Sequence, residues 1–263
     1  MKSPDLKGEI ALVTGGAGAI GSALGQALER AGATVVRTDL RGDGNGIVPL
    51  DVTDRAAFAR VAADVRAQHG SLDILVNNAG IGWGGEAQDI PADQWDHSLD
   101  VNLRGPVNGI LAVYPAMIER RRGRIVNVAS LAGLVPLPLL VPYAMVKSGL
   151  VGLSTSLRIE AERFGVKVNV ACPGPVDTPF LDSGGVGGGT ATAGLEPRRF
   201  LTASAGPAMT PDRFAAAVLD GMATNRAVIV PGRARVLYGL ARFVPRVTAR
   251  VIDRNMRVEL KHG

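Results

Sequence analysis

Residues 9–21 read Glu9-Ile-Ala-Leu-Val-Thr-Gly-Gly-Ala-Gly-Ala-Ile-Gly21. The apolar run at the start predicts a short, buried parallel strand, which leads directly into a glycine-rich turn. A helical pattern follows from Ser22 to Ala31 and is ended by Gly32. Glycines let backbone N–H groups approach a ligand, and the positive end of the helix dipole favours an anion. We therefore interpret residues 9–31 as the cradle for the pyrophosphate of a nucleotide.

The rest of the chain repeats this alternation of strand and helix. Together with the first strand, the expected strands number seven, and the further six cover residues 33–38, 47–50, 72–76, 124–129, 166–171 and 227–230. We expect an α/β fold: a Rossmann-like, doubly wound, seven-stranded and mostly parallel sheet with helices on both faces. We divide the chain into one dinucleotide-binding and catalytic domain (1–232), with a substrate loop at about 180–209, and a basic, amphipathic C-terminal extension (233–263).

Composition limits the class of protein. The chain has 263 residues, of which 46% are hydrophobic, and a single cysteine, Cys172. One cysteine cannot form an internal disulfide, and the N-terminus has no signal-peptide pattern, so we expect a reducing, cytoplasmic location. The 22 residues from Ile125 to Val146 carry no charge. Because Asn127, Ser130 and three prolines interrupt them, a buried strand and loop is favoured over a membrane span.

Asp39 ends the second expected strand and lies 24 residues beyond Gly15. A carboxylate there accepts hydrogen bonds from the hydroxyls of an adenosine ribose and repels a 2′-phosphate, which favours NAD over NADP. Arg37 and Arg41 leave NADP open, since either could meet a phosphate. A third interpretation is that Asp39 merely caps a loop.

The stretch from Ser130 to Lys147 carries groups that can transfer a proton. Tyr143 and Lys147 are four residues apart, so they share one face of a helix and place an ammonium beside a phenol. A nearby cation favours the phenolate, and a phenol with a lowered pKa can exchange a proton with an alcohol oxygen. Ser130 ends the strand at 124–129, where its hydroxyl could point at the same oxygen.

Taken together, these motifs resemble those of the short-chain dehydrogenase/reductase family, over roughly residues 6–180. The resemblance rests on Thr14-Gly15-x3-Ala19-x-Gly21, Asn77-Asn-Ala-Gly80, Asn102, Ser130, Tyr143-x3-Lys147 and Pro173-Gly174-x-Val176-x-Thr178. The family usually has glycine where Ala19 stands, so one additional methyl group could crowd the diphosphate.

The resemblance implies a hydride transfer between a secondary alcohol or ketone and C4 of NAD. Tyr143 would be the general acid/base, Lys147 would lower its pKa and bind the nicotinamide ribose, and Ser130 would hold the substrate oxygen. Asn102 would hold a water of a proton relay. The remaining cofactor contacts that the resemblance implies are Gly15, Ala19, Ile20 and Gly21 at the diphosphate, Asp39 at the adenosine ribose, Asp51 and Val52 at adenine, Asn77, Ala79 and Gly80 at the second ribose, and Pro173, Gly174, Val176 and Thr178 around the carboxamide.

The sequence indicates the chemical class of the substrate less clearly. Residues 131–141 are wholly apolar and either pack in the core or line an apolar cavity for a lipophilic alcohol or ketone. The glycine-rich run at 184–189 predicts a mobile substrate loop. Two alternatives stay open: an NADP-linked ketoreductase, and a non-catalytic NAD-binding or redox-sensing protein on the same fold. The three histidines have no metal-ligand spacing, so we expect no metal, and no nucleic-acid motif is present.

The C-terminal tail is basic and amphipathic. Arg242, Arg246, Arg250 and Arg254 recur every four residues, and Leu240, Phe243, Val247 and Val251 follow another face, interrupted by Pro245. This pattern fits a solvated helix packed on its own domain, an anionic membrane surface or a partner subunit. The family resemblance also implies a homodimer or homotetramer, assembled through the two long helices.

Overall fold

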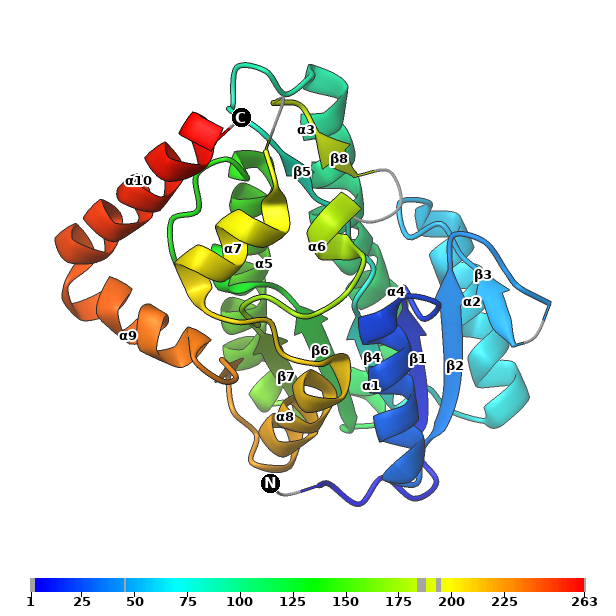
Figure 1. The fold of residues 1–263 in the computed structure, drawn as a ribbon. Helices are drawn as coiled ribbons and strands as arrows, with labels where there is room; N and C mark the ends of the chain where they lie inside the picture. The colour runs from blue at the N-terminus through cyan, green and yellow to red at the C-terminus, as the bar shows by residue number, and fades with distance from the viewer. Residues whose placement is uncertain (1–2, 45, 184–187, 193–194, 263) are drawn as a thin grey trace.

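The sheet expected from the sequence is confirmed in a computed structural model, which describes residues 3–44, 46–183, 188–192 and 195–262. All of its strand pairs are parallel (Figure 1). Across the sheet the order is β3 (Ile47–Pro49), β2 (Thr34–Asp39), β1 (Ile10–Thr14), β4 (Ile74–Asn77), β6 (Gly123–Val128), β7 (Val166–Ala171) and β9 (Val228–Ile229). The order reverses between β1 and β4, and in such sheets ligands bind at the carboxyl ends of the strands beside that point.

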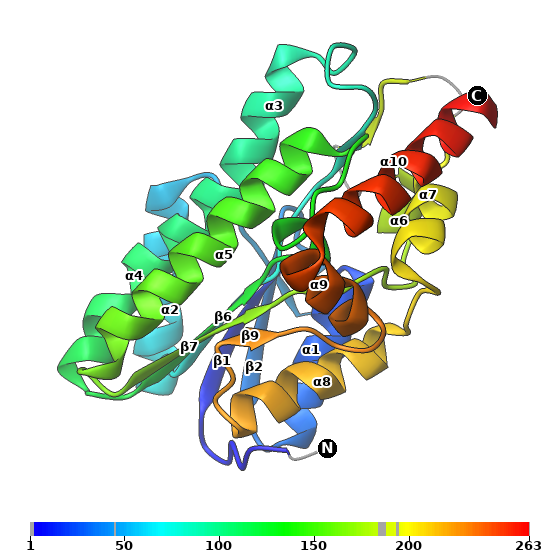
Figure 2. The ribbon, with the colours of Figure 1, turned by 90° about the vertical axis from the view of Figure 1, so that its left-hand side faces the viewer.

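Helices cover both faces of the sheet (Figure 2). On one face α1 (Ala19–Arg30) and α8 (Pro211–Ala223) pack against alternate residues of β1 such as Ala11 and Val13. On the other face α2 (Arg55–His69), α4 (Gly105–Glu119) and α5 (Val141–Glu162) enclose Leu12 and its neighbours. Because successive side chains of a strand point to opposite faces, a continuous apolar run suits this doubly covered sheet.

Two helix starts follow the local chemistry of the sequence. The carboxylate of Asp54 accepts a hydrogen bond from the N–H of Ala57, 2.9 Å away, and caps α2. The hydroxyl of Thr210 accepts one from the N–H of Arg213 and caps α8, which has proline in its first turn. Each cap satisfies an N–H group that has no partner within its own helix.

The sequence predicts one long helix from about Ala92 to Arg121, kinked at Pro106, but the structure divides this segment in three. It consists of α3 (Ala92–Leu99), a π-helical turn (Asp100–Arg104) and α4. We expected a kink just after Asn102, at Pro106; the departure instead lies in the turn before that proline. Proline has no N–H to donate to the carbonyl four residues earlier, that of Asn102, so the backbone widens there.

The loops at the carboxyl edge contain short elements. These are β5 (Trp83–Gly84), the single 3₁₀ turn η2 (Leu131–Gly133), α6 (Phe180–Ser183), β8 (Gly189–Thr190) and α7 (Pro197–Ala205). Strands β5 and β8 pair in parallel, which joins the segment after β4 to the expected substrate loop. Most of the glycine-rich run that predicted mobility, at 184–189, lies outside the described residues.

The tail forms two helices, α9 (Ala234–Phe243) and α10 (Pro245–His262). Their inner side chains Ala234 and Ile252 are buried in one cluster with Leu150 of α5 and Val170 of β7. The buried carboxylate of Glu259 is paired with Arg199 of α7, 2.9 Å away. Residues 233–262 therefore pack on the body of the domain. Among the described residues, no helix combines the length and hydropathy needed to cross a membrane.

A glycine fixes the turn after β6 against α5. A Cβ atom at Gly133 would lie 2.5 Å from the carbonyl oxygen of Lys147. At Gly152, an exposed position inside α5, a Cβ would have no neighbour within 4 Å. The close packing at Gly133 thus holds the Ser130 end of β6 beside the helix that carries Tyr143 and Lys147.

We predict opposite effects of alanine at these two positions. Gly133→Ala should lower the free energy of unfolding by about 1–3 kcal/mol, because backbone atoms must move to admit the methyl group. Gly152→Ala should raise it by about 0.5–1 kcal/mol, since alanine restricts the unfolded chain more than glycine does. Urea unfolding followed by circular dichroism measures both, and equal effects would contradict the packing described here.

Candidate active site

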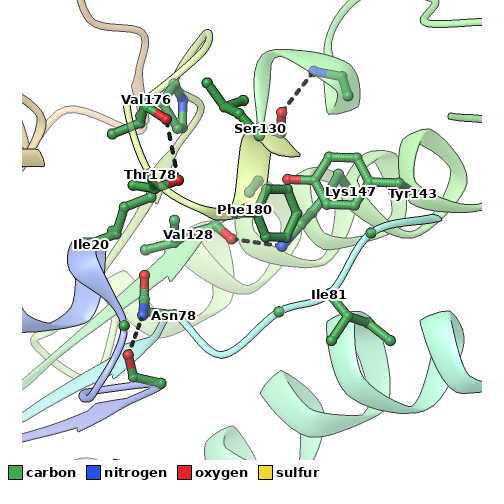
Figure 3. A pocket seen from close by; sticks show the side chains of 18 of the residues that line it. Ile20, Asn78, Ile81, Val128, Ser130, Tyr143, Lys147, Val176, Thr178 and Phe180 are labelled. Atoms are coloured by element: carbon green, nitrogen blue, oxygen red, sulfur yellow. Dashed lines mark hydrogen bonds between the residues drawn. The ribbon is translucent and has the colours of Figure 1, made fainter. Parts of the chain in front are cut away.

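One cavity of about 980 Å³ opens along the carboxyl edge of the sheet. Its lining includes the glycine turn after β1, the loops after β4, β6 and β7, and parts of α5, α7, α9 and α10. One end is lined by glycines and polar side chains and the other by apolar side chains. Figure 3 shows Ile20, Asn78, Ser130, Tyr143 and Lys147 around this space.

The glycine turn fits a diphosphate. Gly15 has a φ of +65°, which favours glycine, and a Cβ at Gly21 would overlap the carbonyl oxygen of Gly15. Helix α1 begins at Ala19 without a side-chain cap, so its first N–H groups face the cavity with the positive end of the helix dipole. Gly15, Ala19, Ile20 and Gly21 all line the cavity, and their contact with a diphosphate stays a prediction. Ala19 itself is exposed.

Asp39 lies beside that turn. Its two carboxylate oxygens accept hydrogen bonds from the N–H groups of Ala17 (3.0 Å) and Leu40 (2.8 Å). Arg37 is turned away and paired with Glu29, 2.8 Å distant, and neither Arg37 nor Arg41 is among the lining residues. At this end of the cavity the carboxylate of Asp39 therefore lines the space, whereas the guanidinium groups of Arg37 and Arg41 do not.

The adenine end of the predicted site is formed by the segment after β3. Asp51 and Val52 both line the cavity. The carboxylate of Asp51 accepts hydrogen bonds from the N–H and the hydroxyl of Thr53, at 2.9 and 2.7 Å. These bonds hold the loop closed on itself and present the side of Val52 to the cavity.

Of the two adjacent asparagines at the end of β4, only the second faces the cavity. Asn78 lines the cavity and donates from its amide nitrogen to the carbonyl oxygens of Thr14 and Gly15, at 3.0 and 3.1 Å. Asn77, which we predicted at the second ribose, is buried outside the cavity and donates to Asn127, 2.8 Å away. Neighbouring side chains of a strand point to opposite sides, so only one of the two can face the ligand edge. Ala79 and Gly80 line the cavity as expected.

Ser130, Tyr143 and Lys147 meet in the middle of the cavity. The Tyr143 hydroxyl points toward Ser130 (Figure 3). The Ser130 hydroxyl accepts a hydrogen bond from the N–H of Ala132, 3.2 Å away. The ammonium of Lys147 donates to the carbonyl of Val128 at 3.1 Å and lies 5.4 Å from the centre of the Tyr143 ring. Phe180 packs on that ring with centroids 5.8 Å apart.

Desolvation dominates the electrostatics of this group. Removal of water raises the pKa of Tyr143 to about 12, although its hydrogen bond with Ser130 opposes the change. Burial also lowers the pKa of Lys147 to about 8, because the cation loses its hydration. The lysine was expected to pull the phenol pKa below its usual value; in this arrangement desolvation of the phenol outweighs any such pull.

Asn102 occupies a different position from the other candidate catalytic residues. It is fully buried in the π-helical turn and does not line the cavity. Its amide oxygen accepts from the N–H of Ile81 (3.2 Å), and its amide nitrogen donates to the carbonyl of Ile81 (3.0 Å). Asn102 thus clamps the chain just after Gly80, and its role in a proton relay stays a prediction.

The loop after β7 forms the opposite wall. Pro173, Gly174, Val176 and Thr178 all line the cavity, and their contact with a carboxamide stays a prediction. The Thr178 hydroxyl donates to the carbonyl of Val176 at 3.2 Å. Arg198 of α7 fixes the outer side of this loop, because it donates to the carbonyl of Thr178 and pairs with Asp177 and Asp182.

The other end of the cavity is apolar. The loop of residues 131–141 contributes Leu131, Ala132, Val135, Pro136, Leu137 and Leu140. Leu181, Leu201 and Ala205, which belong to the expected substrate loop, form part of the remaining wall. Sequence reasoning missed the rest of it, Leu237 and Ile252. The last two belong to the C-terminal tail, whose apolar periodicity predicted a helix but not the surface it packs on. Among the described residues, no group of three or more His, Cys, Asp or Glu side chains could hold a metal ion.

The similar proteins described next, one solved structure and three curated relatives, are all named as dehydrogenases or oxidoreductases. A short-chain dehydrogenase from Streptomyces avermitilis superposes with a TM-score of 0.80 and 27% identity, covering 96% of this chain and 98% of that one. The probable oxidoreductase EphD of Mycobacterium tuberculosis is 36% identical over 91% of this chain, which spans only 44% of the length of that relative.

Two further relatives have the same sequence identity to this chain. The oxidoreductase UcpA of Escherichia coli is 36% identical over 68% of this chain and 73% of its own length. The D-beta-hydroxybutyrate dehydrogenase of Rhizobium meliloti is 36% identical over 65% of this chain and 73% of its own length. A family model described as short chain dehydrogenase matches residues 9–184. The chain therefore belongs to the short-chain dehydrogenase/reductase family, as its motifs predicted.

Proposed function

We propose that this protein is an NAD-linked oxidoreductase that transfers a hydride between a secondary alcohol or ketone and the cofactor. The observation that carries the proposal is the position of the Tyr143 hydroxyl. It lies in the same cavity as the glycine turn, beside the Ser130 hydroxyl and one helical turn from Lys147. A purely structural tyrosine would not need a desolvated hydroxyl facing a nucleotide-sized space. The same reasoning disfavours a non-catalytic NAD-binding protein.

In the proposed reaction the residues of this chain position the reactants and move one proton. A bound nicotinamide supplies the acceptor for the hydride from the carbinol carbon when an alcohol is oxidised. Ser130 holds the substrate oxygen, and Tyr143 takes the proton from it. Lys147 stabilises the resulting phenolate by its charge and donates to the ribose of the cofactor. In the reverse direction Tyr143 returns the proton to the carbonyl oxygen.

The choice of NAD over NADP rests on Asp39. Its carboxylate is fixed by two backbone N–H groups at the rim of the cavity, where the adenosine ribose would lie. A 2′-phosphate there would meet a negative charge at short range, whereas ribose hydroxyls can donate to it. The competing arginines do not weaken this argument, since Arg37 is paired with Glu29 and Arg41 does not line the cavity.

The substrate we infer is uncharged and lipophilic. Beyond Ser130 and Tyr143 the cavity is lined by aliphatic side chains, and apart from His97 the described lining residues hold one basic side chain, Lys147. A hydroxy acid, such as the substrate named for the Rhizobium relative, brings a carboxylate that would need another cation in that apolar end. An alkyl chain, in contrast, gains free energy from burial there.

We also propose that copies of the chain assemble through α4 and α5. The two helices lie side by side on one face of the molecule (Figure 2), and Leu111 and Ile159 on them are exposed. Exposed aliphatic side chains on packed helices favour an interface between copies. The reducing cytoplasm suits such an enzyme, because the one cysteine, Cys172, is a free and buried thiol.

We predict that Tyr143→Phe lowers kcat at least about a hundredfold, because it removes the proton-transferring group and leaves the ring in place. The dissociation constant for NADH, measured by fluorescence titration, should change little. The matched control is Tyr114→Phe on α4, whose ring lies outside the cavity. A Tyr143→Phe enzyme with wild-type kcat would refute the assignment.

The wild-type pH profile gives a second measure of the same group. Since the pKa of Tyr143 is raised to about 12, the phenol is protonated at neutral pH and can act as the acid in ketone reduction. Alcohol oxidation needs the phenolate, so its rate should rise with pH and reduction should fall. This opposite dependence should disappear in the residual activity of Tyr143→Phe.

Asp39→Asn should reduce the preference for NAD over NADP. The amide keeps the size of the side chain but carries no charge, so the ratio of kcat/KM for the two cofactors should fall about tenfold, equivalent to about 1.4 kcal/mol. The control is Asp43→Asn, which removes the same charge four residues later and outside the cavity. A wild-type enzyme that prefers NADP would contradict the cofactor assignment.

A series of secondary alcohols with increasing chain length tests the apolar substrate. The kcat/KM should rise about fourfold for each added methylene until the cavity is filled. Leu237→Trp should shorten the longest accepted chain, because this side chain lines the cavity. Val236→Trp, on the outer side of the same helix, should leave the series unchanged. A preference for short hydroxy acids would contradict the inferred lipophilic substrate but would not contradict the proposed hydride transfer.

A further inference from the structure

The outer face of the two C-terminal helices carries an unusual concentration of apolar side chains. Of the thirteen large hydrophobic side chains that are exposed in the described residues, seven lie on or between α9 and α10. They are Val236, Leu240, Phe243, Val244, Val247, Val251 and Val258. Phe243 is 81% exposed, although burying a phenylalanine is strongly favourable in water. Exposed apolar patches of this kind mark interaction sites.

The segment that forms these two helices has a high net positive charge. Residues 233–261 contain eight Arg or Lys and two Asp or Glu, a net charge of +6, against +5 for the whole chain. Both acids are already paired within the described structure: Asp253 with Arg257, and Glu259 with Arg199. No ion pair is found there for Arg242, Arg246, Arg250 or Arg254. These arginines are exposed and can meet an external anion.

Apolar and cationic side chains alternate around the helices. On α10, side chains three, four and seven residues apart share a face, so Val247, Val251 and Val258 form one stripe, with Arg250 and Arg254 beside it. The opposite side of α10, with Thr248, Ile252 and Glu259, is buried against the domain. Both helices lie at the surface (Figures 1 and 2) and are joined only by Val244, so their exposed faces belong to one continuous surface.

We propose that this surface, formed by α9 and α10, docks the protein on an anionic lipid membrane. Aliphatic side chains and Phe243 would enter the boundary between headgroups and acyl chains, and the arginines would pair with lipid phosphates, their long side chains reaching back to the headgroups. A second copy of the chain fits less well, because two such surfaces would bring a net charge of +6 against another of +6.

The inner side of the same helices connects this surface with the cavity. Leu237 of α9 and Ile252 of α10 line the apolar end of the cavity, one residue from exposed Val236 and Val251. Docking would therefore place the wall of the substrate cavity at the lipid surface, where a lipophilic alcohol or ketone concentrates. This last step rests on the proposed function; the docking itself does not.

Flotation of the full-length protein with vesicles, without cofactor or substrate, tests the docking. We expect binding to vesicles of phosphatidylcholine with phosphatidylglycerol at low ionic strength, and much weaker binding to phosphatidylcholine alone. The triple variant Arg246→Gln, Arg250→Gln, Arg254→Gln should lower the partition coefficient on the order of a hundredfold, which corresponds to about fivefold for each exposed arginine. High salt should have a similar effect.

The matched control removes three arginines elsewhere: Arg30→Gln, Arg60→Gln and Arg213→Gln. All three are exposed on α1, α2 and α8, so the net charge changes equally. This control should keep vesicle binding within about threefold of wild type. Equal loss in the two triple variants would overturn the proposal, because general charge and not this surface would then attract the protein.

Phe243→Ser tests the apolar part, with Val48→Ser on the exposed edge strand β3 as its control. Phe243→Ser should weaken binding several-fold, and Val48→Ser should not. If the wild type binds neither vesicle, or if Phe243→Ser lowers the sedimentation coefficient because copies separate, the surface is not a membrane-docking surface. Kinetics play no part in these assays, so failure of the proposed reaction would leave their outcome unaffected.

Discussion

The hydroxyl of Thr14 joins the two strand ends between which the cavity opens. It accepts hydrogen bonds from the N–H groups of Asn78 and Ala79, at 3.0 and 3.1 Å, and donates to the carbonyl of Val76. Asn78 returns two bonds to the backbone of Thr14 and Gly15. These contacts lie where the strand order reverses, so the loops after β1 and β4 turn away from each other and leave room for a ligand. The glycine turn and Asp39 on one side, and Gly80 on the other, depend on this connection.

The second constraint is the loss of hydration at Tyr143, which is half-buried, and at Lys147, which is buried. A phenol and an ammonium share an environment that penalises charge on either group, so the tyrosine pKa rises and the lysine pKa falls. A nearby charge changes the protonation of such a pair strongly, because it acts at a low effective dielectric. A positively charged nicotinamide ring, when bound, would favour the phenolate.

The two faces of the C-terminal helices differ in chemistry. The inner face completes the core and the apolar end of the cavity through Ala234, Leu237 and Ile252. The outer face leaves valines, Phe243 and arginines exposed to solvent. A helix of a single globular domain usually has a polar outer face. The departure from that pattern is what distinguishes this tail from a segment that only stabilises the fold.

Local chemistry determined much of this protein from the sequence alone. Short apolar runs alternating with helices predicted the parallel sheet, because buried parallel strands are apolar on both faces. Glycines 15 and 21 predicted the diphosphate turn, since side chains do not fit there. The spacing of Tyr143 and Lys147 put them on one face of α5, and the family motifs placed Ser130, Asp39 and the 173–178 loop in one cavity.

Tertiary structure decided which side chains face the cavity and which are buried, because the spacing of residues in the sequence does not determine this. Which of Asn77 and Asn78 faces the cavity depends on the orientation of β4 in the sheet, and burial of Asn102 depends on how the π-helical turn meets Ile81. Desolvation of Tyr143 arises from residues distant in the sequence, so the direction of its pKa shift could not be read from its lysine neighbour. Likewise, the amphipathic pattern of the tail specified two helices, but only their packing on α7 and β7 decided that Leu237 and Ile252 line the cavity and that Phe243 stays outside.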